Sequence, residues 1–258
     1  MSIHRLLVST LVTALLPLVA YAASVDPLDS ARWKDMQKQF FPKAKVVFDN
    51  AVKVDVPAVA DNALFVPVMV NAAALGEVRE VMVFADFNPI PLALRFTPGR
   101  AEPILGVRIK LQQSTPVRAA ARDAKGVWHV GGAWVSTSGG GCTLNTTAVR
   151  TPEWERRLNE TVGRLWTRDN GSTRFRFRVI HPMDTGFAPG IPAFYLQELK
   201  LADADGSLLM RIEPFEPVSE NPVFTLNLKP GKHDAVSVTG RDNNGNLVDA
   251  KVTQGVAQ

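Results

Sequence analysis

Short segments in which apolar and polar residues alternate constrain the fold of this chain more than any other feature. In Arg174–Ile180, arginine alternates with phenylalanine and valine, so an extended strand would have one polar and one apolar face. Similar segments recur along the chain, separated by residues that favour turns. We therefore predict an all-β protein built from antiparallel, immunoglobulin-like β-sandwiches.

The predicted strands form two groups. The first comprises Val46–Val54, Ala63–Val70, Glu77–Phe84, Leu92–Phe96, Val107–Leu111, Val117–Ala121 and Val127–Val135. The second comprises Arg174–Ile180, Ala193–Leu201, Ser207–Ile212, Val223–Leu228, Ala235–Thr239 and Leu247–Val252. We assign one sandwich to residues 23–135 and another to residues 171–258, with residues 136–170 as a connector.

Two short helices are also predicted. Ser30–Phe40 has apolar residues at helical spacing, and Pro42 ends it. In the connector, Thr151 is a suitable N-cap. The following apolar stripe consists of Trp154, Leu158, Val162 and Leu165. The segments Asp203–Gly206 and Asp242–Gly245 predict hairpin turns rather than calcium loops, because the distal glutamate of such a loop is missing.

The amino-terminal residues predict export. Arg5 precedes an apolar stretch, Leu6–Ala20, which ends in the small-residue pattern Ala20-Tyr21-Ala22. This order is typical of a secretory signal peptide, so we expect cleavage after residue 22 and a periplasmic location. The stretch is shorter than the roughly 20 residues of a membrane-spanning helix, and we expect no span after cleavage. The charge balance, 29 basic against 25 acidic residues, does not favour nucleic acid as a partner.

The single cysteine, Cys142, follows three glycines in a segment rich in serine and threonine. It has no partner for an internal disulfide, and a buried structural cysteine usually occurs in an apolar strand. We interpret Gly139, Gly140 and Gly141 as a flexible arm that leaves a reactive thiol exposed to water.

Several stretches carry a resemblance to a known family. Ala31–Cys142 resembles SoxY, the sulfur-carrying half of the SoxYZ complex of thiosulfate oxidation, notably in Phe84–Pro89, Val107–Leu111 and Gly139–Cys142. Phe175–Val252 resembles its partner SoxZ, notably in His181–Gly186 and Ile191–Ala193. The whole chain is similar to the fused SoxYZ-like carriers associated with quinoprotein dehydrogenases.

The resemblance implies that Cys142 holds a sulfur cargo covalently, as a persulfide or thiosulfonate, and presents it to separate enzymes. Those partners would be periplasmic sulfur-oxidation enzymes or a quinoprotein dehydrogenase system. The resemblance also implies that the two halves pack on each other and that the carrier has no catalytic site or cofactor of its own. In SoxY the cysteine lies at the carboxyl end, whereas here Thr143-Leu144 follows and the chain continues.

Alternatives remain open. The protein could instead be a non-covalent docking module, chaperone or subunit for a periplasmic dehydrogenase, or could exchange mixed disulfides with a protein. The three arginines of Arg174–Ile180 could serve docking, although we favour a solvated face that guards a sheet edge. His181-Pro182-Met183 suggests copper, but no pair of histidines has a local ligand spacing, so we predict no metal site. The motifs of zinc proteases, nucleotide-binding loops and serine hydrolases are missing from the sequence.

Overall fold

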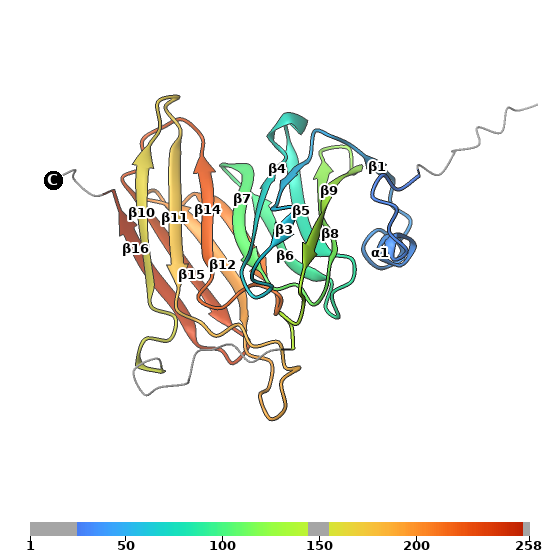
Figure 1. Cartoon of the computed structure of the whole chain (residues 1–258). Coiled ribbons are helices and arrows are strands. Elements are labelled where there is room, and N and C mark those ends of the chain that lie inside the picture. Colours follow the sequence, from blue (N-terminus) through green and yellow to red (C-terminus); the bar gives the residue numbers. More distant parts are fainter. Residues whose placement is uncertain (1–24, 144–154, 255–258) are drawn as a thin grey trace, which may run out of the picture.

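Two β-sheets packed face to face dominate the computed structural model, which describes residues 25–143 and 155–254 (Figure 1). In the ten-stranded sheet the order is β1-β9-β8-β5-β6-β13-β12-β15-β16, with β3 beside β9. In the six-stranded sheet the order is β10-β11-β14-β7-β4-β2. The predicted all-β, immunoglobulin-like class is confirmed.

The first half contains α1 (Trp33–Phe40), β1 (Val46–Phe48), β2 (Lys53–Asp55), β3 (Val59–Ala60), β4 (Val66–Asn71), a 3-10 turn (Ala73–Leu75), β5 (Val78–Ala85), β6 (Leu92–Pro98), β7 (Ala101–Ile109), β8 (Thr115–Asp123) and β9 (Trp128–Thr137). The second half contains β10 (Thr161–Thr167), β11 (Thr173–Val179), β12 (Leu196–Asp203), β13 (Leu208–Pro214), β14 (Val223–Leu228), β15 (Ala235–Asp242) and β16 (Leu247–Thr253). None of the helices in these described residues is long and apolar enough to cross a membrane.

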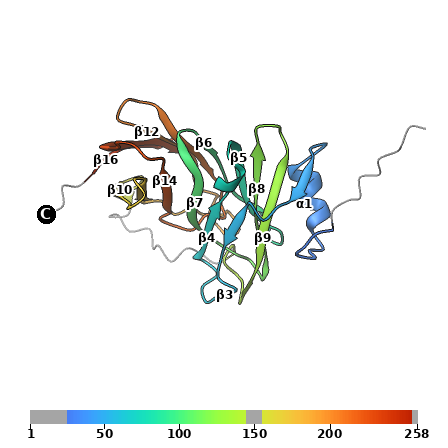
Figure 2. The same cartoon turned by 90° about the horizontal axis from the view of Figure 1, so that it is seen from above.

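The two halves share both sheets. Strand β6 pairs antiparallel with β13 in the large sheet, and β7 pairs antiparallel with β14 in the small one. Buried apolar residues from both halves consequently form a single cluster between the sheets. Figure 2 shows the strands of the first half continuing edge to edge into those of the second.

Strand β11 shows how the sequence pattern determines the faces. Phe175 and Phe177 are buried, whereas Arg176 and Arg178 are exposed, as the alternation predicts. The expectation that this strand lies at a sheet edge is wrong, because β10 pairs with it on one side and β14 on the other.

The connector differs from its prediction. Residues 161–167 form strand β10 instead of the end of a helix, and residues 151–154 lie outside the described residues. Pairing with β11 along the whole strand overrides the helical spacing, and it buries Leu165 while leaving Val162 45% exposed.

Helix α1 and both hairpin turns are confirmed. The helix buries Trp33 and Met36 on the outer face of the large sheet. Beside it, Arg118 is buried and ion-paired with Asp26 at 2.7 Å and with Asp86 at 3.0 Å, which fastens the amino-terminal segment to β8. The two predicted turns connect β12 to β13 and β15 to β16.

Candidate functional site around Cys142

The glycine segment after β9 lies against the residues that follow β7. The amide of Gly141 donates to the carbonyl of Leu111 at 2.9 Å, and that of Gly140 donates to the carbonyl of Gln112 at 2.8 Å. Gly139 and Gly140 adopt φ of 83° and 85°, a region that favours glycine. A Cβ on Gly141 would lie 2.2 Å from the carbonyl oxygen of Ala63, so only glycine fits this close approach.

Cys142 is buried by this arrangement, with 2% of its surface exposed. Its thiol donates to the carbonyl of Lys110 at 3.8 Å, and its amide donates to Oε1 of Gln112 at 3.3 Å. Its carbonyl accepts a hydrogen bond from Oγ1 of Thr185, in the second half, at 2.7 Å. The expectation of a water-exposed thiol is wrong for this structure, because the amides of Gly140 and Gly141 bind the segment to Gln112 and Leu111 and the cysteine side chain is buried there.

Lys110 is the cation of the site, and only 2% of it is exposed. Its ammonium donates to the carbonyls of Met183 and Glu216. Its own carbonyl accepts from Nδ2 of Asn88 at 2.8 Å. Segments from both halves therefore hold this lysine beside the thiol.

Burial changes the proton affinity of both groups. It raises the pKa of the Cys142 thiol to about 11, against the attraction of the Lys110 ammonium. It lowers the pKa of Lys110 to about 8, against the attraction of the thiolate and of nearby carboxylates, Asp184 among them. At neutral pH the closed site thus holds a protonated thiol, which is a poor nucleophile.

His181 and Met183, the residues that suggested copper, lie close to this site and contact other protein groups there. His181 is fully buried, its Nδ1 accepts from the amide of Met183 at 3.1 Å, and its Nε2 lies 3.6 Å from the Asp242 carboxylate. Burial lowers the pKa of His181 to about 4 despite that carboxylate. Within the described residues, no three side chains of the ligand types His, Cys, Asp and Glu gather as a metal site would require.

Sequence reasoning missed Lys110, Asn88 and Thr185 as members of the site. All three lie in stretches that carry the family resemblance, yet nothing in their local sequence marks a function. Lys110 gives no usable signal, because it follows β7 and alternates with the exposed Arg108 in Val107–Leu111, so the pattern places it on the polar face.

Comparisons with known proteins divide the chain into the same two halves. Residues 37–142 match the family described as sulfur oxidation protein SoxY, and Cys142 is the last residue matched. Residues 165–253 match the family described as sulphur oxidation protein SoxZ.

One solved structure similar to this chain is the sulfur carrier protein SoxY from Chlorobium limicola f thiosulfatophilum. It is 20% identical, with a TM-score of 0.37, and the match covers 42% of this chain and 96% of that one. No curated protein matches the chain.

Proposed function

Because this chain belongs to the SoxY–SoxZ family of sulfur-oxidation proteins, with both domains in one polypeptide, we propose that it carries a sulfur cargo covalently on Cys142. The observation that carries the proposal is the position of this one cysteine. It follows the tightly fitted Gly139–Gly141 segment, and residues of both halves hold it.

Loading by thiol–disulfide exchange requires no external oxidant. The Cys142 thiolate attacks the terminal sulfur of a persulfide, R–S–SH, on a donor protein. The bond between the two donor sulfurs breaks, R–S⁻ leaves with the electron pair, and the product on this chain is Cys142–S–SH. Unloading reverses the exchange toward an acceptor thiolate.

Burial makes this chemistry conditional on opening. In the closed site the raised pKa of Cys142 keeps the thiol protonated, and its burial keeps it out of reach of a partner. We propose that the segment around Gly139–Cys142 breaks its hydrogen bonds to Leu111 and Gln112 when a partner loads it, and that solvation then returns the thiol to an ordinary pKa.

The compartment and partners belong to the same proposal. The apolar stretch Leu6–Ala20 and the small-residue pattern at its end support export to the periplasm, where the carrier would serve sulfur-oxidation enzymes or a quinoprotein dehydrogenase system. We propose that the protein has no catalytic site of its own.

The buried thiol also supports a second candidate function. A closed cysteine with 2% exposure is what a non-covalent docking module, with a purely structural Cys142, would have. The two functions differ in whether Cys142 ever carries an added mass.

The test is the intact mass of the mature protein isolated from its native compartment, with and without reductant. A carrier shows a mass excess of one or more sulfurs, or of a thiosulfonate group, that reductant removes and that Cys142→Ser abolishes. A control substitution at another buried small residue, Ala119→Ser, keeps the excess. A bare thiol under conditions in which the partner enzymes are active assigns the protein to the docking function.

A further inference from the structure

A hollow on the outer face of the six-stranded sheet crosses the junction between the halves. It has a volume of about 460 Å³, and its lining comes from β2, β4 and β7 of the first half and β11 and β14 of the second. Gly106 forms part of its floor, between Thr225 and Met69 on the neighbouring strands. A second hollow of about 450 Å³ adjoins it over β10 and β11 and shares Arg176 and Val223 with it.

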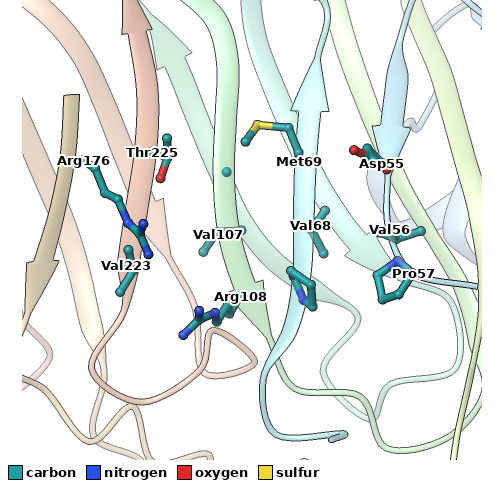
Figure 3. A pocket seen from close by; sticks show the side chains of 12 residues that line it. Asp55, Val56, Pro57, Val68, Met69, Val107, Arg108, Arg176, Val223 and Thr225 are labelled. Atoms are coloured by element: carbon teal, nitrogen blue, oxygen red, sulfur yellow. The ribbon is translucent and has the colours of Figure 1, made fainter. Parts of the chain in front are cut away.

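Four exposed arginines surround these hollows: Arg108, Arg164, Arg176 and Arg178. Figure 3 shows the guanidinium groups of Arg108 and Arg176 pointing toward Val223 from opposite sides. Within the described residues, none of the four has a carboxylate within 4.0 Å. Asp55 lines the far side of the first hollow, and Glu160, which is paired with Arg157, also attracts Arg178.

This face contrasts with the other sheet. There, Arg95 pairs with Glu80 at 2.8 Å and Arg211 pairs with Glu198 at 2.7 Å. On the six-stranded sheet, by contrast, Arg164 lies directly opposite Arg176 in the β10–β11 ladder. Like charges opposite each other destabilise a sheet, and protection of a free edge does not explain those on β11, an interior strand.

We propose that this arginine face is a docking surface for an acidic segment of a partner protein. The charges extend from β7 to β10, three strand spacings or about 14 Å, which exceeds what one small anion can contact. Several carboxylates along an extended segment match this spread. A second copy of this chain is disfavoured as the occupant because its net charge is +4.

The arginine face lies close to the segment that contains Cys142, so docking there would bring a partner near the thiol. Arg108 lies two residues before Lys110 on the same chain segment, so a partner bound over Arg108 is next to the end of β7 where the cysteine segment lies. The first hollow crosses the pairing of β7 with β14, so a partner bound over Arg108 and Arg176 contacts both halves at once.

The test uses the mature chain and a ten-residue peptide of alternating glutamate and serine. Nuclear magnetic resonance spectra of the ¹⁵N-labelled protein at low salt should show peptide-induced shifts that cluster at Gly106, Thr225 and Arg176. The double variant Arg108→Gln/Arg176→Gln should bind the peptide about tenfold more weakly. The control Lys125→Gln/Lys251→Gln removes two exposed charges elsewhere and should bind like the wild type.

Three results would overturn the proposal: shifts spread over the whole surface, equal weakening in both double variants, or complete displacement by a few millimolar sulfate, which would indicate a free-anion site. Cys142→Ser should bind the peptide unchanged. Peptide binding requires no thiol, so the docking proposal would survive if the mass test showed no cargo on Cys142. Conversely, a loss of peptide binding would not affect the result of the mass test.

Discussion

The substitution Gly141→Ala tests whether the close fit of the glycine segment keeps the thiol closed. The added Cβ would lie 2.2 Å from the carbonyl oxygen of Ala63 and 2.7 Å from that of Leu111. Both are backbone atoms of the core and cannot move away cheaply. We therefore expect the segment that contains Cys142 to leave its groove while the two sheets stay folded.

The size of the effect follows from the pKa of the thiol. With a pKa of about 11 in the closed site, about one molecule in ten thousand carries the thiolate at pH 7. At the ordinary value of 9.0 the fraction is about one in a hundred. The open variant should thus react with iodoacetamide about a hundredfold faster, and the midpoint of its rate against pH should fall from about 11 to about 9.

The matched control is Gly240→Ala, whose Cβ would lie 2.0 Å from the carbonyl oxygen of Glu198, in the second half. It introduces the same kind of backbone clash in the other half of the chain. Circular dichroism is used to choose a temperature at which both variants are folded. Equal alkylation rates and pH midpoints in Gly141→Ala and the wild type would refute the reasoning. An equal increase of the alkylation rate in Gly240→Ala would show that general loosening of the fold, and not the close fit of Gly141, controls the reactivity of the thiol.

Three further substitutions probe the contacts around the site and the amino-terminal segment. In the wild type, the unfolded chain binds the Lys110 proton more tightly than the folded chain between about pH 8 and 10.5. The wild-type free energy of unfolding should therefore increase by on the order of 1 kcal/mol from pH 7 to 9. Lys110→Met should remove this increase. Urea titrations at the two pH values measure this, and an identical rise in the variant would contradict it. Thr185→Val deletes the hydroxyl that donates to the cysteine carbonyl and should accelerate alkylation about fivefold, whereas Thr185→Ser should not. Arg118→Met leaves the Asp86 carboxylate buried and unpaired and should cost about 3 kcal/mol in urea unfolding, whereas the exposed Arg100→Met should cost less than about 1 kcal/mol; equal losses would exclude a special role for the buried pair.

Local features of the fold were predictable because their causes are local. Alternation determined the two faces of β11, and Asp/Asn–Gly sequences determined the hairpins after β12 and β15. Strand pairing depends on residues far apart in the chain, so the sequence did not reveal that β6 pairs with β13 or that β11 is interior. Strand β10 was mistaken for a helix because Leu158, Val162 and Leu165 happen to have helical spacing.

The candidate site was predictable only as far as its cysteine. Composition identified Cys142, because it is the single cysteine of the chain and directly follows three glycines. Its buried position involves contacts with Lys110, Gln112 and Thr185, which lie 30 to 43 residues away in the sequence and belong to two different halves. No local pattern encodes such convergence, so an exposed thiol was the natural but wrong expectation. The carrier role of Cys142 stays a prediction.

The tether on both sides of Cys142 limits how the thiol can meet a partner. Cys142 is the fifth residue after Thr137, the end of β9, so even when fully extended its backbone reaches only about 17 Å from that strand. The chain must then return through residues 143–160 to start β10. A loop of this kind cannot enter a deep, narrow channel by its tip. Under the proposed carrier function, a loading enzyme would have to approach the surface at the end of β7, which would make a docking face beside Arg108 more useful here than on a carrier whose cysteine sits at a free end.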